Sequence, residues 1–98
     1  MKTFCFDIDG TICTITDGKY DEAEPYPTRI EQLNKLHQEG NKVILFTARG
    51  TSTGIDWKNT TTKQLNKWGV KYDELLFGKP EADFFVDDKA TDLFNWFD

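Results

Sequence analysis

The sequence lacks the features that mark secreted, zinc-binding and membrane-spanning proteins. Its only two cysteines, Cys5 and Cys13, come without a secretory signal pattern, so we expect no disulfide framework. No Cys/His cluster has the spacing of a zinc site, and no run of about 18 apolar residues could form a membrane helix. These absences predict a soluble, cytoplasmic protein with no membrane partner.

Positive charge is scarce as well. Twelve lysines and arginines face 17 aspartates and glutamates, for a net charge of −5, and Arg29 and Arg49 are the only arginines. This balance argues against a basic nucleic-acid surface, so nucleic acid is not the expected partner. Eight Phe, three Trp and three Tyr residues supply large side chains for the core of a 98-residue chain. We expect residues 1–98 to form a single domain.

Apolar runs of strand length alternate with segments of helical periodicity. The strand-like runs are 2–8, 43–46, 75–77 and 82–86, and the helical segments run from the prolines at 25 and 27 to Gly40, from 57 to 68, and from 90 to 97. Residues 12–15 and 19–23 flank a Thr-Asp-Gly turn signal and predict a short β-hairpin flap. The alternation predicts an α/β fold of three layers (α/β/α), a Rossmann-like parallel sheet with helices on its faces.

Polar clusters follow three of the strand-like runs. Asp7 and Asp9 end the first, Thr47 follows the second, and the pair at 87–88 follows the run at 82–86. The carboxyl ends of parallel strands meet at one edge of a sheet, where α/β proteins keep their ligand crevice. We therefore expect these side chains to converge, and Lys79, just past the run at 75–77, could reach the same edge.

Such a set of groups suits phosphate chemistry with a hard cation. Mg²⁺ prefers carboxylate oxygens, bridges to phosphate oxygens and offsets the repulsion between the acids. A hydroxyl and a lysine fit the remaining phosphoryl oxygens. One carboxylate can attack phosphorus to give an aspartyl-phosphate. A second carboxylate, two residues on, is placed to donate a proton to the leaving alcohol and later to take one from water.

The order of these clusters resembles that of the haloacid dehalogenase (HAD) superfamily of phosphotransferases. The run Asp7-Ile8-Asp9-Gly10-Thr11 is similar to its first motif, Thr47 to its second, Lys79 to its third, and Asp87-Asp88 after Phe84-Phe85-Val86 to its fourth. The resemblance covers nearly the whole chain. It implies a Mg²⁺-dependent phosphatase that acts on a small phosphorylated substrate.

The resemblance also implies roles for the first two aspartates. Asp7 would be the nucleophile and a Mg²⁺ ligand. Asp9 would be the general acid/base, and its backbone carbonyl would bind the metal. An acid at position 9 is typical of the phosphatases and mutases of the superfamily, whereas its ATPase branch carries Thr there.

The other motifs would hold the phosphoryl group and the metal. By resemblance, Thr47 hydrogen-bonds the phosphoryl group and Lys79 neutralises its charge. Asp87 would coordinate Mg²⁺ directly, and Asp88 directly or through water. Only seven residues separate Lys79 from Asp87, where many relatives place a helix. Either this branch lacks that helix or Lys89 takes the part, and the Gly-Lys-Pro context favours Lys79.

The slots in which relatives carry a cap domain are short in this chain. Residues 12–24 hold only the predicted hairpin, and a single predicted helix separates the second and third motifs. The resemblance therefore implies a member with no cap domain. Such members act on larger substrates or close the site with a neighbouring subunit, so we expect a homo-oligomer. Residues 47–50, 64–70 and 77–80 further resemble small HAD proteins associated with capsule and lipopolysaccharide sugar biosynthesis, which implies a sugar phosphate as substrate.

Other interpretations stay open. The aspartates of the clusters also suit turns and helix caps, and Thr47 suits a local backbone contact. Arg49 suits a substrate contact, through its planar guanidinium, or a surface ion pair. For the whole chain, the alternatives are a non-catalytic or regulatory HAD-like module, a signalling receiver domain, and a phosphatase for nucleotides or nucleic-acid ends.

Overall fold

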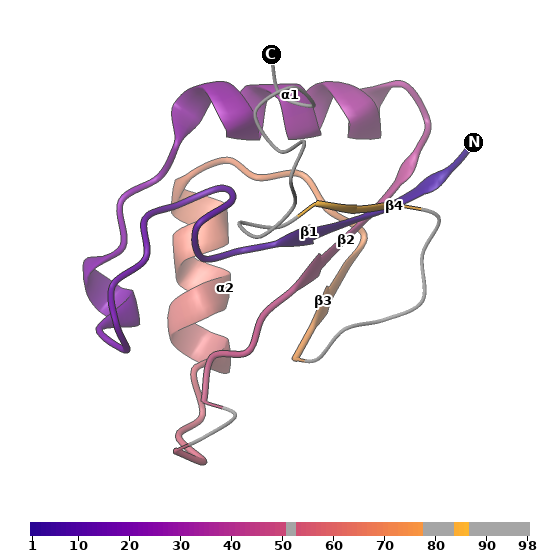
Figure 1. Cartoon of the computed structure of the whole chain (residues 1–98). Coiled ribbons are helices and arrows are strands. Elements are labelled where there is room, and N and C mark those ends of the chain that lie inside the picture. Colours follow the sequence, from indigo (N-terminus) through magenta and orange to yellow (C-terminus); the bar gives the residue numbers. More distant parts are fainter. Residues whose placement is uncertain (51–52, 78–83, 87–98) are drawn as a thin grey trace.

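The computed structural model describes residues 1–50, 53–77 and 84–86, which form one parallel sheet with flanking helices (Figure 1). The strands are β1 (Thr3–Asp7), β2 (Lys42–Phe46), β3 (Glu74–Leu76) and β4 (Phe84–Val86), in the order β3-β2-β1-β4. Every neighbouring pair is parallel. The predicted α/β class is therefore confirmed, with strand ends that differ by one or two residues from the predicted runs.

The register brings the ends of the strands level. Asp7 of β1 pairs with Phe46 of β2, and Phe6 pairs with Val86, the last residue of β4. The Ile8 N–H continues the ladder by donating to the Phe46 carbonyl, 3.2 Å away. β1, β2 and β4 thus end at one edge of the sheet, which we call the carboxyl edge.

Two α-helices connect the strands in the described part of the chain. α1 (Pro27–Gln38) begins with proline, which suits a first turn because its missing N–H would have no partner there. α2 (Lys58–Lys67) begins after Asp56, whose Oδ1 accepts the Lys58 N–H at 2.9 Å. Both helices are followed closely by a glycine, Gly40 or Gly69, with φ of +94° or +71°. Glycine adopts this conformation at low cost, so both helices stop where predicted.

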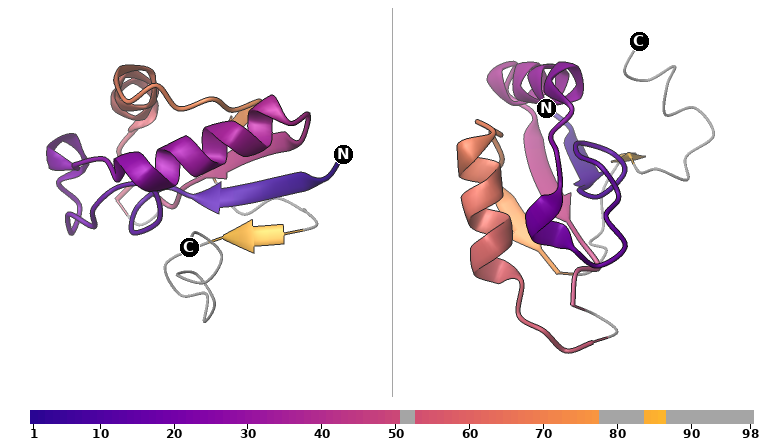
Figure 2. Two further views of the ribbon diagram at one scale, coloured as in Figure 1. Left: turned by 90° about the horizontal axis from the view of Figure 1, so that it is seen from above. Right: turned by 90° about the vertical axis from the view of Figure 1, so that its left-hand side faces the viewer.

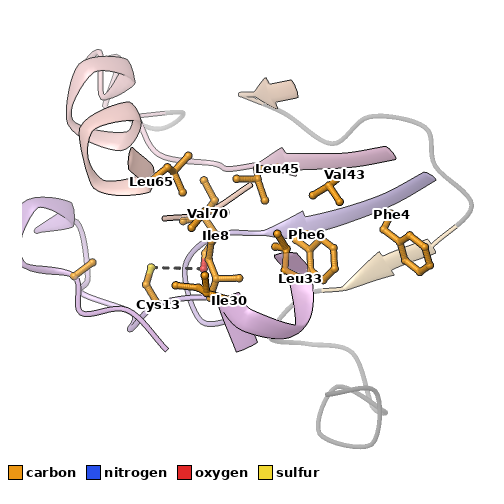
Figure 3. Packing of buried hydrophobic residues seen from close by; sticks show 12 residues of the cluster. Phe4, Phe6, Ile8, Cys13, Ile30, Leu33, Val43, Leu45, Leu65 and Val70 are labelled. Carbon is orange, nitrogen blue, oxygen red and sulfur yellow. Dashed lines mark hydrogen bonds between the residues drawn. The ribbon is translucent and has the colours of Figure 1, made fainter. Parts of the chain in front are cut away.

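The main core lies between one face of the sheet and both helices (Figures 2 and 3). Alternate residues of a strand point to the same face, and each fully buried leucine there contributes about 2 kcal/mol. This packing fixes α1 and α2 against the sheet, and with them the loops at the carboxyl edge. The buried members are Phe4, Phe6, Ile8, Ile12, Cys13, Ala23, Ile30, Leu33, Val43, Leu45, Leu65 and Val70.

A smaller apolar cluster occupies the opposite face of the sheet. It contains Cys5, Ile44 and Phe46, with Leu76 packed against them. Strands that are apolar on both faces are typical of parallel sheets covered on both sides. The predicted helix at 90–97 lies outside the described residues.

The segment between β1 and α1 forms a flap, residues 12–24. Its two arms meet as predicted, through an antiparallel bridge between Cys13 and Pro25 and a 2.9 Å hydrogen bond from the Thr14 N–H to the Glu24 carbonyl. The outer arm differs from the predicted strand, because it forms the 3-10 helix η1 (Tyr20–Glu22). The backbone of this arm makes local hydrogen bonds, from the Glu22 N–H to the Lys19 carbonyl at 2.9 Å and from the Ala23 N–H to the Tyr20 carbonyl at 3.2 Å.

The positions considered for a cap hold small elements only. In residues 1–50 and 53–77 these are the flap and α2, with no cap domain. Across the described ranges, neither helix has the length and hydropathy to cross a bilayer.

Candidate active site

Asp7 ends β1 beside a cleft of about 200 Å³ at the carboxyl edge. Its Oδ1 accepts the Ile8 N–H at 2.8 Å, which orients the carboxylate. Although β1 ends at Asp7 and does not extend to Asp9, both carboxylates border the cleft. The lining residues are Asp7, Asp9, Ile15, Thr16, Asp17, Gly18, Tyr20, Ala48 and Arg49.

A tight turn, and not a continued strand, places Asp9 at the cleft. Gly10 adopts φ of +86°, and the Thr11 N–H donates back to the Ile8 carbonyl at 3.2 Å. Arg29 of α1 donates to the carbonyls of Gly10 and Thr11 at 3.3 and 3.1 Å. The Asp-Gly-Thr sequence thus makes the turn, and α1 holds it from outside.

Asp9 forms a bidentate ion pair with Arg49. Nε and Nη2 of the arginine donate to Oδ2 and Oδ1 of the carboxylate at 2.9 and 2.8 Å. The Arg49 side chain is fully buried, whereas the Asp9 side chain keeps 20% of its surface exposed. An ion pair was one of two expected roles of Arg49, but it is buried and not at the surface.

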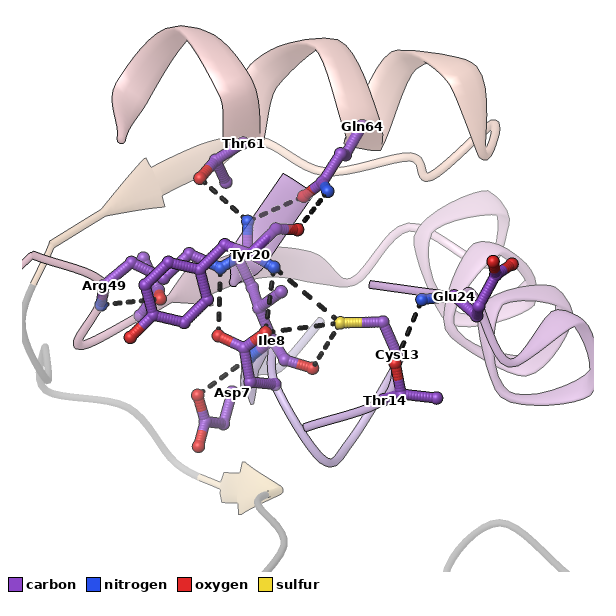
Figure 4. Close-up of polar contacts among 11 residues, drawn as sticks. Asp7, Ile8, Cys13, Thr14, Tyr20, Glu24, Arg49, Thr61 and Gln64 are labelled. Atoms are coloured by element: carbon purple, nitrogen blue, oxygen red, sulfur yellow. Dashed lines mark hydrogen bonds and ion pairs between the residues drawn. The ribbon is translucent and has the colours of Figure 1, made fainter. Parts of the chain in front are cut away.

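Sequence reasoning missed the residues that surround Arg49. Thr61 and Gln64 of α2 accept hydrogen bonds from its guanidinium (Figure 4). The centre of the Tyr20 ring lies 4.8 Å from Cζ of Arg49, within the range of a cation–π contact. Thr61 and Gln64 are three residues apart and so share a helix face. That spacing could have indicated a joint role, but it does not reveal a partner elsewhere in the chain.

The Cys13 thiol is buried next to the same ion pair. Its Sγ lies 3.5 Å from Oδ1 of Asp9 and 3.6 Å from the Ile8 carbonyl oxygen. Burial, and then the negative charge of Asp9, raises the pKa of Cys13 to about 12. Cys13 therefore stays a neutral thiol near pH 7 and acts as a weak hydrogen-bond donor.

Thr47 follows β2 and is almost completely buried, with 1% of its surface exposed. Its N–H donates to the Leu76 carbonyl at 3.1 Å, and its Oγ1 accepts the Arg49 N–H at 3.1 Å. The hydroxyl can still donate its own proton. The next residue, Ala48, lines the cleft, whereas Thr47 is not among the lining residues.

Two buried threonine hydroxyls have no hydrogen-bond partner within the described part of the chain. They belong to Thr11 and Thr16. Buried hydroxyl groups are normally paired with protein or water, and Thr16 lines the cleft. The sequence indicated only a turn at Thr16.

Three predicted site residues, Lys79, Asp87 and Asp88, lie outside the described residues, as does Lys89. β4, which directly precedes Asp87 in the chain, pairs with β1 and ends at Val86. Residues 1–50, 53–77 and 84–86 alone contain no group of three or more His, Cys, Asp or Glu side chains able to hold a metal ion. A metal site therefore stays a prediction that needs the acids at 87 and 88.

Solved structures of other proteins share this fold, although no family model matches the chain. A protein from Vibrio cholerae aligns over 99% of this chain and 88% of its own, with 32% identity and a TM-score of 0.78. The D,D-heptose 1,7-bisphosphate phosphatase from B. bronchiseptica, complexed with magnesium and phosphate, aligns over 85% of this chain with 24% identity and a TM-score of 0.54. A chain of the Pnkp1/Rnl/Hen1 RNA repair complex aligns over 94% with 22% identity and a TM-score of 0.65.

These relatives differ in how much of their length is shared. This chain spans 88% of the Vibrio protein, but only 52% of the heptose bisphosphate phosphatase and 29% of the RNA repair chain. The last two are therefore similar in fold alone. Proteins described as HAD-like phosphatases have this fold too. The chain therefore shares the fold of proteins described as HAD-like phosphatases, and the Asp-x-Asp-Gly-Thr turn at the end of β1 is similar to the first motif of that superfamily.

Proposed function

We propose that this chain is a Mg²⁺-dependent phosphatase that hydrolyses a phosphate monoester through an aspartyl-phosphate on Asp7. The observation that supports this most directly is that Asp7 and Asp9 border one cleft at the carboxyl edge of a parallel sheet. Arg49 already offsets the charge of Asp9, and a hard cation held by Asp7 would offset the charge of the second carboxylate. Phosphoryl transfer uses two such carboxyl groups beside one cleft, one to attack phosphorus and one to move a proton.

The proposed reaction has two steps that use the two carboxyl groups differently. In the first, which requires the protonated form of Asp9, an Asp7 oxygen attacks phosphorus, the bond to the alcohol oxygen breaks, and the Asp9 carboxylic acid gives that oxygen its proton and becomes a carboxylate. In the second, water attacks the phosphoryl group, the bond to Asp7 breaks, and Asp9 takes a proton from the water. The products are the alcohol and inorganic phosphate, and both carboxyl groups return to their initial states.

The oxygen donors near the cleft suit a hard cation. The carboxylate of Asp7, the backbone carbonyl of Asp9 and the acids at 87 and 88 would hold Mg²⁺. When bound, the ion would neutralise charge on the phosphoryl oxygens. The carboxylates of Asp7 and Asp17 on the cleft wall are oxygen donors of the kind that Mg²⁺ prefers. Lys79 would bind the remaining phosphoryl oxygens, and Thr47 would do so only after its buried hydroxyl turns toward the cleft.

A small phosphorylated sugar is the substrate class that we propose. The cleft of about 200 Å³ suits a small ligand, and Asp7, Asp17 and Arg49 are among the charged residues that line it. The fold neighbours include a sugar-bisphosphate phosphatase and a chain of an RNA repair complex, so likeness of fold does not choose between these classes. Nucleotides and nucleic-acid ends are therefore the alternatives to test beside sugars.

Replacement of the nucleophile tests the covalent mechanism. We expect Asp7→Asn to abolish hydrolysis of an aryl phosphate, because an amide oxygen is a poor nucleophile toward phosphorus. Turnover is measured with Mg²⁺ and with EDTA, on a panel of sugar phosphates, nucleotides and phosphorylated nucleic-acid ends. Asp21→Asn, at an exposed position on η1, is the matched control and should keep full activity.

The same panel separates the possible functions. Full activity of Asp7→Asn would refute the aspartyl-phosphate mechanism. Activity that is unaffected by EDTA would contradict the role of Mg²⁺. Absence of turnover on every ester, with normal folding, would support a non-catalytic HAD-like module in place of an enzyme.

A further inference from the structure

The guanidinium group of Arg49 has all five of its N–H groups paired inside the protein (Figure 4). Nε donates to Asp9, Nη1 donates to Thr61 Oγ1 at 3.0 Å and Gln64 Oε1 at 2.7 Å, and Nη2 donates to Asp9 and to Cys13 Sγ at 3.8 Å. An arginine has no further hydrogen to donate. In this arrangement, a substrate phosphate can hydrogen-bond to Arg49 only if one of these bonds breaks.

Two elements, α2 and the flap, hold Arg49 in place. Thr61, which is fully buried, and Gln64 present their oxygens from consecutive turns of α2. Gln64 also donates to the backbone carbonyl of Tyr20, which ties α2 to η1. The Tyr20 ring covers the guanidinium from the flap. The side chain of Arg49 is thus held by α2 on one side, and on the other side its Nε and Nη2 groups donate to Asp9 at the cleft.

We propose that Arg49 is a positioning residue that holds the carboxylate of Asp9 in place for proton transfer, and that Thr61 and Gln64 act through it. This inference rests on the proposed phosphatase function. A planar guanidinium that binds both oxygens of a carboxylate fixes the plane as well as the position of that group. Proton transfer requires a general acid/base within hydrogen-bond reach of the leaving oxygen. Asp9 directly precedes Gly10 in the turn, and Arg49 holds both of its carboxylate oxygens there.

The proposal differs from a direct phosphate contact in what it predicts for kinetics. A positioning defect weakens protonation of the leaving group. Esters of alkyl alcohols, which leave only with a proton, should then lose more turnover than aryl phosphates, whose alcohols leave readily as anions. A lost phosphate contact would instead weaken binding of all esters and of inorganic phosphate.

The test uses the full chain and variants that leave Asp9 unchanged. We expect the double variant Thr61→Val/Gln64→Leu to lower kcat for an alkyl phosphate by about tenfold, and Arg49→Lys to lower it by about a hundredfold. For both, kcat for p-nitrophenyl phosphate should fall less, and KM and inhibition by inorganic phosphate should stay within about twofold. Thr61→Ser restores the hydroxyl and should behave as the wild type, as should Lys63→Ala at an exposed position of the same helix.

Two kinetic outcomes would overturn the proposal. One is a weaker inhibition by inorganic phosphate with an unchanged ratio of alkyl to aryl turnover, which would make Arg49 a phosphate ligand. The other is wild-type kinetics in the double variant.

A crystal structure of the double variant separates this inference from the proposed function, because it needs no turnover. We expect the Asp9 carboxylate to take a new or mixed orientation there. An unchanged Asp9 would overturn the positioning role, whether or not the wild type hydrolyses any ester.

Discussion

The two ends of the sheet carry ion pairs of different kinds. At the carboxyl edge, Arg49 is fully buried and binds both oxygens of Asp9. At the opposite edge, Lys42 and Glu74, the first residues of β2 and β3, form a 2.8 Å pair in which 43% and 44% of the side-chain surface is exposed. Exposed pairs of this kind contribute little to stability, whereas a buried pair is costly to leave incomplete.

The difference supports the proposal that the active site lies at the carboxyl edge of the sheet. A buried ion pair is no more stable than well-packed apolar side chains of similar volume, because two charges must leave water to form it. The carboxyl edge keeps such a pair and surrounds it with further polar groups, the hydroxyl of Thr61 and the amide of Gln64. At the opposite edge, which we call the amino edge, the ion pairs among the described residues, Lys42 with Glu74 and His37 with Asp73, are ones that water can reach.

Replacing Arg49 at the carboxyl edge and Lys42 at the opposite edge should give the largest difference in the free energy of unfolding. We expect Arg49→Leu to lower the free energy of unfolding by about 3 kcal/mol, because Asp9, Thr61 and Gln64 lose their shared donor in a buried setting. Lys42→Leu should change it no more than the scatter between measurements. Urea unfolding followed by circular dichroism gives both values. Equal effects of the two substitutions would show that the edges do not differ as described.

The elements of the fold were predictable because each is encoded locally. The apolar run at 43–46 identifies β2, and the helical spacing between Trp57 and Trp68 identifies α2, whose end is marked by Gly69. The flap was predicted less well. Its outer arm is η1 and not a strand, because hydrogen bonding within that arm replaced pairing with a neighbour.

The candidate site was predictable only in part. Asp7 and Asp9 border one cleft because they flank the end of a single strand, a relation that their spacing reveals. The pairing of Asp9 with Arg49 joins residues 40 positions apart. It depends on where α2 packs against the sheet, and no local pattern specifies that. The hydrogen bond between Gln64 and the backbone of Tyr20 could not be predicted from the sequence for the same reason.

The buried thiol at the carboxyl edge provides a test of the comparison through alkaline pH. The pKa of Cys13 is about 12 in the folded chain and close to 9 when the chain unfolds. Above about pH 9, the unfolded state therefore releases a proton that the folded state keeps, and stability falls by about 1 kcal/mol per pH unit.

Cys13→Ala removes this ionisable group and should reduce the decline. Urea unfolding of both proteins at pH 8, 9 and 10 measures the difference between their slopes. Other groups that titrate in this range, Lys42 among them, are the same in both proteins and cancel. Equal slopes of unfolding free energy against pH in the two proteins would mean that the folded state does not raise the pKa of Cys13.

The amino edge should give the smallest effect, at acid pH. Asp73 accepts the Val43 N–H at 2.8 Å and lies 3.4 Å from His37, and these contacts, led by the Val43 hydrogen bond, lower its pKa. A lowered folded-state pKa gives stability that is present above about pH 4 and is lost as pH falls through the folded value. Since 41% of the Asp73 side chain is exposed, we expect this contribution to the free energy of unfolding to be less than about 1 kcal/mol.

Asp73→Asn keeps an oxygen for the Val43 N–H but loses the charge. Its deficit in free energy of unfolding relative to the wild type, measured by urea unfolding, should therefore shrink between pH 6 and pH 2. A deficit that grows as the pH falls would contradict the sign of this linkage, and one of several kcal/mol would erase the contrast between the two edges.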